Sequence, residues 1–265
     1  MSTENLQGKW ALILGASSGF GAATARELAG HGMHIIGVHL DRRAALAGVE
    51  ALVQSLQSHG AQTHFFNVNA ADPLKRQEVL DQIQPKLGGS TISVLLHSLA
   101  FGTLKPYLAA DPKEQLTKDQ MEMTLDVMAN SLVYWVQDLL ARKLLGKGSR
   151  VFAMTSSGGT RVLPTYGAVS AAKAALESHI RQLAMELAPY GATANAIRAG
   201  VTDTPALRKI PGNEQMMEFS KVRNPHHRLT SPGDVASAIA ILANSGADWV
   251  TGNTIGVDGG EDIVG

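Results

Sequence analysis

The chain has 265 residues, of which 45% are hydrophobic and 17% are charged, with 23 basic and 23 acidic side chains. This length fits one large domain, and the balanced charge gives no indication of a nucleic-acid or anionic-membrane partner. The absence of cysteine excludes disulfides, zinc thiolate sites and cysteine nucleophiles. The first residues lack the apolar stretch of a signal peptide, and no apolar run is long enough to span a bilayer. We therefore expect a soluble, cytoplasmic protein.

Short apolar runs alternate with longer helical patterns along the whole chain. The pattern predicts strands at residues 10–14, 34–38, 63–66, 94–96, 150–154, 193–197 and 254–257. It predicts helices at residues 22–30, 44–59, 73–87, 127–145, 166–187 and 235–242. Such alternation is typical of an α/β fold with a doubly wound parallel sheet, and strands that are apolar on both faces fit burial between helix layers. We predict a single Rossmann-like domain over residues 1–265, with a mostly parallel sheet of seven strands.

A long segment near the C-terminal end interrupts this alternation. Residues 202–232 are rich in proline and glycine and show little periodicity. Segments of this kind are often lids or binding loops. We predict a substrate-binding loop here.

A glycine-rich turn follows the first predicted strand and opens the first predicted helix. Its glycines let the backbone turn tightly and approach a pyrophosphate, while the helix N-terminus offers free N–H groups and a positive dipole end. A turn without a ligand is the alternative interpretation. The residues of this turn that we expect at a dinucleotide are Gly15, Ser17, Ser18, Gly19, Phe20 and Gly21.

The spacing Gly-x-x-x-Gly-x-Gly resembles the short-chain dehydrogenase/reductase family more than the standard Rossmann fingerprint. The resemblance extends over almost the whole chain. It includes the fourth predicted strand, the segment with Tyr166 and Lys173, the segment Asn195-Ala196-Ile197, and Val257-Asp258-Gly259-Gly260 near the C-terminal end. It implies a nicotinamide cofactor and a homotetramer or dimer.

The end of the second predicted strand bears on the choice between NAD and NADP. An acid there would hold the adenosine ribose, but His39 occupies that position and Asp41 comes two residues later. Arg42 and Arg43 either bind a 2′-phosphate or are solvated residues that open a helix. Ser18 stands where many NADP-binding relatives carry a basic residue, which weakens the case for NADP. We expect NADPH, with NADH as the alternative.

The catalytic pattern departs from that of most family members, which have a serine after a strand and then Tyr-x-x-x-Lys on the next helix. Ser156 and Lys173 fit this pattern, but Val169 stands at the tyrosine position and Tyr166 lies three residues earlier. Three residues are close to one helical turn, so the phenol is displaced by about 5 Å. This displacement suits a substrate whose oxygen lies two bonds beyond the carbon that accepts hydride, as in an α,β-unsaturated thioester.

Tyr-x6-Lys resembles the pattern of enoyl-acyl carrier protein reductases. The resemblance implies reduction of the C=C bond of an enoyl thioester in fatty acid biosynthesis, with the acyl chain on acyl carrier protein or coenzyme A. Tyr166 is then expected to stabilise the enolate, and Lys173 to hold the nicotinamide ribose and lower the pKa of the phenol. Ser156 either orients Tyr166 or the substrate, or only caps the strand. Met128 stands where most members have a catalytic asparagine, so the chain resembles a divergent enoyl reductase. A carbonyl reductase with an unusual centre is the alternative.

The same resemblance assigns further residues to the site. The additional cofactor residues are Asn67, Val68, Ser98, Leu99, Ala100, Gly200, Thr202 and Thr204. Asn67 has a turn role as its alternative, and Thr204 has a cap before Pro205. The substrate residues are Phe101, Tyr166 and Met216. Met216 lies in an apolar stripe that belongs either to the core or to a lid. The histidines lack the spacing of a metal site, and no metal is expected.

Overall fold

The computed structural model describes residues 6–264, and these residues form one α/β domain. Seven parallel strands form one sheet in the order β3-β2-β1-β4-β5-β6-β7. The strands are β1 (Trp10–Leu14), β2 (His34–His39), β3 (Thr63–Asn67), β4 (Ile92–His97), β5 (Arg150–Ser156), β6 (Thr193–Ala199) and β7 (Thr254–Val257). The Rossmann-like fold predicted from the sequence is confirmed.

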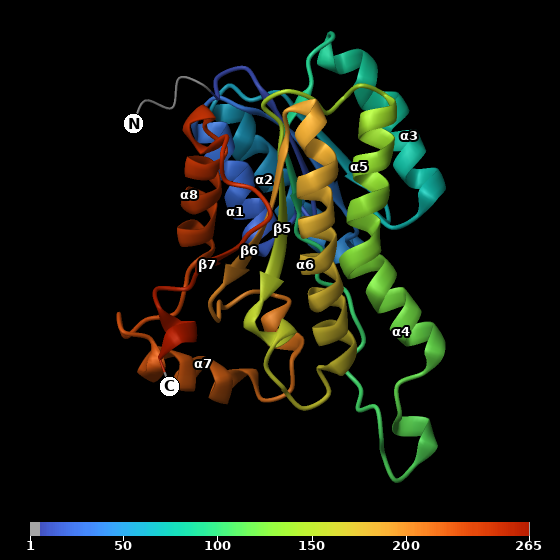
Figure 1. Cartoon of the computed structure of the whole chain (residues 1–265), viewed down its shortest axis with the longest axis vertical. Helices are drawn as coiled ribbons and strands as arrows, with labels where there is room; N and C mark the ends of the chain where they lie inside the picture. The colour runs from blue at the N-terminus through green and yellow to red at the C-terminus, as the bar shows by residue number, and fades with distance from the viewer. Residues whose placement is uncertain (1–5, 265) are drawn as a thin grey trace.

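Helices cover both faces of the sheet (Figure 1). They are α1 (Gly19–Gly30), α2 (Leu46–Ser58), α3 (Pro73–Ile83), α4 (Lys118–Leu125), α5 (Ser131–Ala141), α6 (Gly167–Leu187), α7 (Asn213–Arg223) and α8 (Pro232–Leu242). Successive side chains of a strand point to opposite faces, so each central strand supplies both layers of the core. In β1, Leu12 and Leu14 pack in the layer under α3, α5 and α6, whereas Ala11 and Ile13 pack in the layer under α1, α2 and α8.

The helix starts follow local capping chemistry. Asp72 accepts hydrogen bonds from the backbone N–H groups of Leu74 and Lys75 at the start of α3, where Pro73 occupies the first turn. Ser231 and Asp234 form a reciprocal capping box at the start of α8. Both helix starts can be read from the sequence, because cap and helix are adjacent in the chain.

The single helix predicted at residues 127–145 is wrong at both ends. Helical structure begins at α4, nine residues earlier, because Thr117 forms a capping box there. The last helical turn ends before Lys143, which has φ of 58°. Leu144 and Leu145 lie beyond the helix but are buried in the core, at 5% and 4% exposure. In the sequence, these two leucines continue the apolar pattern of the helix, although the helix has already ended.

The segment at residues 202–232 is more regular than its sequence suggests. It contains a 3₁₀ turn (Leu207–Lys209) and the three-turn helix α7. The predicted substrate-binding loop therefore contains regular helical structure, and its role in binding stays a prediction. In residues 6–264, no helix has the length and apolar character needed to cross a membrane.

Candidate active site

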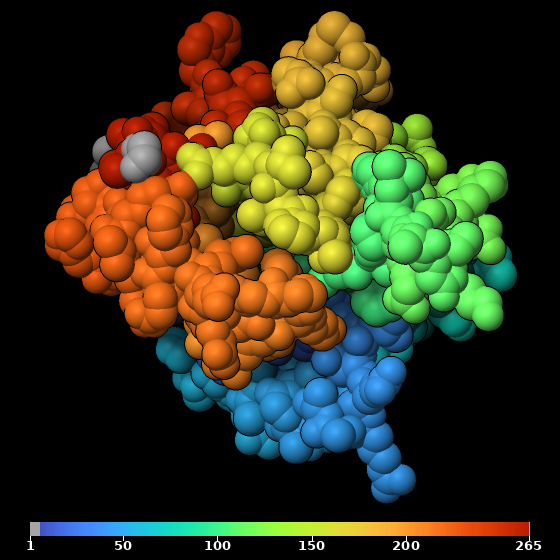
Figure 2. Space-filling view, turned by 90° about the horizontal axis from the view of Figure 1, so that it is seen from below, coloured from blue at the N-terminus to red at the C-terminus, as the bar shows by residue number. Residues whose placement is uncertain are grey.

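Parallel strands place their carboxyl ends at one edge of the sheet, and the predicted site residues follow those ends. The backbone joins neighbouring strand ends directly: Gly15 N donates to Val38 O at 2.8 Å, and Ser98 N donates to Leu14 O at 2.8 Å. Val68 N donates to His39 O at 2.8 Å. Figure 2 looks onto this face, where the orange segment around α7, the yellow segment before α6 and the green segment after β4 lie side by side.

The turn between β1 and α1 is built so closely that it requires glycine. A Cβ atom placed on Gly15 would lie 2.4 Å from Ser98 O, and Gly15 also has φ of +88°. A Cβ atom placed on Gly21 would lie 2.0 Å from Gly15 O. The side chain of Ser18, the N-cap of α1, makes no capping hydrogen bond, and the first turn carries no acid. Free N–H groups at a helix N-terminus without a competing carboxylate fit the pyrophosphate of a dinucleotide.

The segment after β6 lies against this turn. Thr204 Cγ2 is 3.5 Å from a Cβ atom placed on Gly19, and the side chains of Thr202 and Thr204 are buried. Thr202 Oγ1 donates to Gly200 O at 2.9 Å. Thr204 Oγ1 accepts from Leu207 N at 3.2 Å, so Thr204 caps the following turn, as its alternative interpretation requires. The structure thus brings the predicted phosphate and nicotinamide segments together.

The end of β2 is held by a small polar cluster. His39 Nδ1 lies 2.8 Å from Asp41 Oδ2. Asn67 accepts from Asp41 N at 2.9 Å and donates to Asp41 O at 3.0 Å. Asn67 therefore acts as a turn residue here, and it fixes the backbone immediately before Arg42.

Several predicted site residues are exposed at the edge of this face. Phe101 is 59% exposed, Arg42, Arg43 and Ala100 are exposed, and Met216 on α7 is half-buried. The structure places these residues at the edge of the site. Three predicted cofactor residues beside the glycine turn are half-buried: Ser17, Phe20 and Leu99.

The three predicted catalytic side chains converge where β5 meets the start of α6. Tyr166 is the N-cap residue of α6, and its hydroxyl lies 3.4 Å from Ser156 Oγ. Lys173 Nζ donates to Met154 O at 2.7 Å. Thr165, directly before the tyrosine, has φ of 61°, a strained conformation for a β-branched residue. Strain of this kind is concentrated at functional sites.

Burial dominates the electrostatics of this centre. It raises the pKa of the Tyr166 phenol, and the hydrogen bond from Ser156 opposes the shift. The net shift of the phenol pKa is upward, and the lowering of this pKa by Lys173 stays a prediction. Burial also lowers the pKa of Lys173 to about 8, against the attraction of Glu177. The lysine still carries its proton at neutral pH.

An apolar cluster fills the place of the usual carbonyl-reducing centre. Met128 and Val169 occupy the positions that are asparagine and tyrosine in most family members, and both are buried beside Tyr166. A Cβ atom placed on Gly102 would lie 2.9 Å from Met128 Sδ, 2.9 Å from Val169 Cγ2 and 2.8 Å from Thr124 Cγ2. These side chains therefore close tightly around Gly102. No polar group stands at either position.

A π-helical turn, Asp126–Asn130, carries Met128 between α4 and α5. Ser131 Oγ donates a hydrogen bond to Val127 O at 2.9 Å. His97 Nε2 and Ser131 Oγ form a second hydrogen bond at 2.9 Å. Burial and the nearby charge of Lys173 lower the pKa of His97 to about 3, so the ring is neutral. His97 is not among the residues that the sequence predicts for the site. Within residues 6–264, no cluster of His, Asp and Glu side chains is arranged to hold a metal ion.

The comparisons with known proteins agree with this geometry. A family model described as Enoyl-(Acyl carrier protein) reductase matches residues 15–261. The chain is 29% identical to the NADH-dependent enoyl-[acyl-carrier-protein] reductase FabI of Nostoc sp., covering 98% of this chain and 99% of that one. It is also 29% identical to the 3-oxoacyl-[acyl-carrier-protein] reductase FabG of Escherichia coli K12, covering 98% and 100%. The sequence identities alone do not separate C=C from C=O reduction.

Solved structures of an enoyl reductase and of a short chain dehydrogenase have folds similar to that of this chain. The crystal structure of FabI from Candidatus Liberibacter asiaticus has a TM-score of 0.85 and 25% identity, with 98% of each chain covered. A short chain dehydrogenase from Burkholderia cenocepacia in complex with NADP has a TM-score of 0.81 and 26% identity, covering 97% of this chain and 99% of that chain. Fold, glycine turn and family match together show that the chain is an NAD(P)-dependent oxidoreductase that belongs to the short-chain dehydrogenase/reductase family, in the group described as Enoyl-(Acyl carrier protein) reductase.

Proposed function

We propose that this protein reduces the C=C bond of an enoyl thioester with NADPH. The packing around Gly102 carries the proposal. A carbonyl reductase needs its proton donor at the oxygen bonded to the carbon that accepts hydride, but Met128 and Val169 make that region apolar and full. The phenol of Tyr166 lies instead beside Ser156, one helical turn toward the start of α6. A donor at this place suits an oxygen two bonds beyond the hydride acceptor.

The residues of the chain then have distinct tasks. The glycine turn, the segment 200–204 and Lys173 would hold the reduced nicotinamide, which would supply the hydride. Tyr166 donates a hydrogen bond to the thioester oxygen as negative charge develops there, which is worth about 3–4 kcal/mol in well-studied oxyanion sites. Because burial raises the pKa of Tyr166, the phenol is protonated at neutral pH and can donate this hydrogen bond to the thioester oxygen. Ser156 orients the phenol through their hydrogen bond.

Carbonyl reduction is the second candidate. Two observations favour it. The chain is 29% identical to the 3-oxoacyl reductase, and the Ser156–Tyr166 pair resembles the serine and tyrosine of most family members. It requires a substrate carbonyl that reaches the phenol past Val169.

Steady-state rates separate the two candidates. Purified protein is given NADPH with crotonyl and acetoacetyl thioesters of equal chain length, each carried by coenzyme A and by acyl carrier protein. We expect faster turnover of the crotonyl thioester, and faster turnover of the acetoacetyl thioester would contradict the proposal. Tyr166→Phe should lower kcat by about 100-fold or more, because it removes one oxyanion donor and little volume. Cofactor binding should be unchanged in this variant.

The choice of cofactor rests on the loop after β2. Asp41 is drawn back toward His39, while Arg42 and Arg43 are exposed and available for a 2′-phosphate. Alanine at both arginines should raise KM for NADPH more than KM for NADH. A wild type that already prefers NADH would contradict this assignment.

The remaining features complete the proposal. Residues 202–232, with Met216 on α7, cover the acyl chain together with Phe101. The acyl group is carried by acyl carrier protein or coenzyme A in fatty acid biosynthesis in the cytoplasm.

The chain assembles as a homotetramer, and sedimentation velocity at micromolar concentration should show that species; a monomer alone would contradict it.

A further inference from the structure

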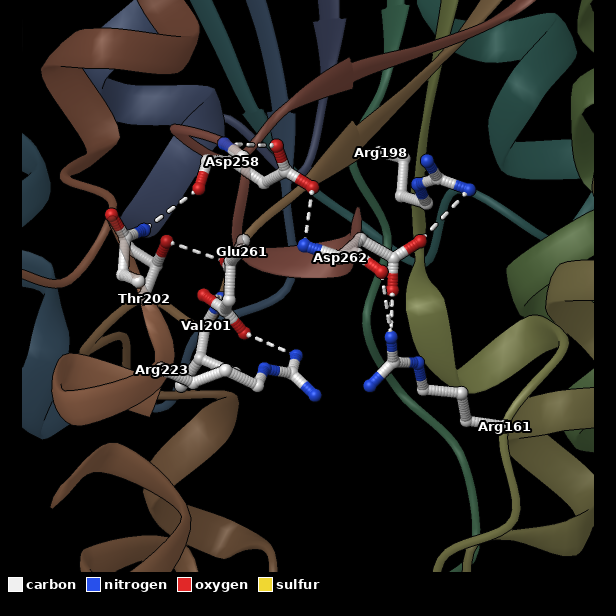
Figure 3. Close-up of polar contacts among 11 residues, drawn as sticks. Arg161, Arg198, Val201, Thr202, Arg223, Asp258, Glu261 and Asp262 are labelled. Carbon is white, nitrogen blue, oxygen red and sulfur yellow. Dashed lines mark hydrogen bonds and ion pairs between the residues drawn. The ribbon is translucent and has the colours of Figure 1, made fainter. Parts of the chain in front are cut away.

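The turn that follows β7 contacts three separate parts of the candidate site: the segment after β6, the end of α7 and the loop before Tyr166. We define the C-terminal turn as residues 258–263. Asp258 organises it: its carboxylate accepts from Gly260 N at 3.0 Å and from Asp262 N at 3.2 Å, and its carbonyl accepts from Glu261 N at 3.1 Å. Figure 3 shows how the carboxylates of Glu261 and Asp262 leave this turn toward different segments of the chain.

Glu261 reaches the segment that follows β6. Its side chain is 4% exposed, and Oε2 accepts from Val201 N at 3.1 Å. Its other oxygen, Oε1, lies 3.3 Å from Arg223 at the end of α7. A Cβ atom placed on Gly200 would lie 3.0 Å from Glu261 Oε2, so the backbone of Gly200 approaches the carboxylate closely. A buried carboxylate that binds a backbone N–H and a guanidinium holds both in one place.

Asp262 reaches the loop that carries the catalytic tyrosine. Asp262 Oδ1 lies 2.8 Å from Arg161 Nη2, and the Asp262 carbonyl accepts from the same group at 2.9 Å. Asp262 Oδ2 lies 3.2 Å from Arg198 on β6. Arg161 N in turn donates to Ser157 O at 2.9 Å. The loop between β5 and Tyr166 is thus fixed to the end of β6 through one aspartate.

We propose that Glu261 and Asp262 are positioning residues with separable effects: Glu261 sets the cofactor-binding segment 200–204, and Asp262 sets the loop before Tyr166. This inference rests on the proposed site, since it assigns the cofactor to residues 200–204 and catalysis to Tyr166. Neither carboxylate touches a reacting atom. Each acts through one backbone segment, so loss of Glu261 weakens cofactor binding and loss of Asp262 slows turnover.

Direct titration of NADPH by quenching of protein fluorescence tests the first half. Glu261→Ala removes the acceptor of Val201 N and should raise Kd about tenfold or more, as expected for one charge-assisted hydrogen bond. Glu261→Gln keeps an oxygen that can accept from Val201 N and should restore most of the affinity. Lys221→Ala is the matched control, because its ion pair with Glu218 lies exposed on the same helix as Arg223. An unchanged Kd in Glu261→Ala, or equal weakening by alanine and glutamine, would overturn the proposal.

Kinetics at saturating cofactor test the second half. Asp262→Asn and Arg161→Ala should both lower kcat about tenfold, with Kd for NADPH within about twofold of wild type. A rise in Kd without a fall in kcat would overturn the separation of roles. Circular dichroism establishes that each variant is folded before it is assayed. The cofactor titration needs no substrate, so it remains decisive even if neither thioester in the test of the proposed function is turned over.

Discussion

The buried charge of Lys173 is expected to lower the free energy of unfolding of the protein. The ammonium group is buried, and it donates a hydrogen bond to the neutral carbonyl of Met154. Methionine has a similar unbranched shape and carries no charge. Lys173→Met should therefore stabilise the protein, while it should abolish the proposed contact to the nicotinamide ribose.

The size of the effect follows from the pKa. Burial lowers the pKa of Lys173 from 10.5 to about 8. At about 1.4 kcal/mol per pH unit, the charged form is disfavoured by roughly 3 kcal/mol in the folded state. The variant also loses the hydrogen bond to Met154 O, which costs about 1 kcal/mol. At pH 7 we expect Lys173→Met to raise the free energy of unfolding by about 2 kcal/mol.

The pH dependence has a defined direction. Between pH 8 and 10.5 the unfolded lysine binds a proton that the folded lysine has released, so the stability of the wild type rises with pH in this window. The penalty is fully present below pH 8. The advantage of the methionine variant should therefore shrink as pH rises from 8 toward 10.5.

Urea denaturation followed by circular dichroism measures this directly. Wild type and Lys173→Met are compared at pH 7 and at pH 10, without cofactor, and the other lysines cancel in the difference. A variant that is less stable than wild type at pH 7, or a difference that does not change with pH, would refute the assignment of a buried, charged Lys173.

Three further substitutions test the local geometry. Thr165→Asn should raise the free energy of unfolding by about 1 kcal/mol, because asparagine tolerates the φ of 61° better than threonine; thermal denaturation measures it, and no gain would count against strain at this residue. Gly21→Ala should weaken NADPH binding about fivefold or more, since forcing its Cβ away from Gly15 O costs about 1–3 kcal/mol; an unchanged titration would contradict a role of this turn in binding. Asp72→Ala should lower stability by about 1 kcal/mol in urea denaturation through loss of its cap, whereas an unaltered midpoint would show that the cap is dispensable.

The parts of the fold that follow from local patterns could be predicted. Each strand was located from its apolar run, and the predicted start of α3 at Pro73 is confirmed. The helix predicted from residue 235 begins three residues earlier, at Pro232, where Ser231 and Asp234 form the capping box. The helix at residues 127–145 was misplaced because Leu144 and Leu145 are buried by the core and not by a helix. Helix α7 was missed because its first turn follows Gly212, which offers no capping side chain.

The residues of the candidate site also fall into those that a local motif predicts and those that only the fold brings together. Tyr166, Lys173 and the glycine turn stand in short motifs whose spacing carries their chemistry. Glu261 and Asp262 have no such motif, because their partners Val201 and Arg161 lie 60 and 101 residues away in the chain. The net upward shift of the Tyr166 pKa could not be predicted either, since it depends on how deeply the phenol is buried.

The packing around Gly102 has a consequence for how this protein could change its reaction. Met128, Val169 and Gly102 share one space, so the value of any substitution there depends on the other two residues. Asparagine at position 128 alone would place an amide against apolar carbon, and tyrosine at position 169 alone would have no room. Under the proposed C=C reduction, a route to carbonyl reduction through single substitutions therefore passes through poorly packed or unsatisfied variants. Strong epistasis of this kind would keep related chains on separate reactions even where most of their sequence drifts freely.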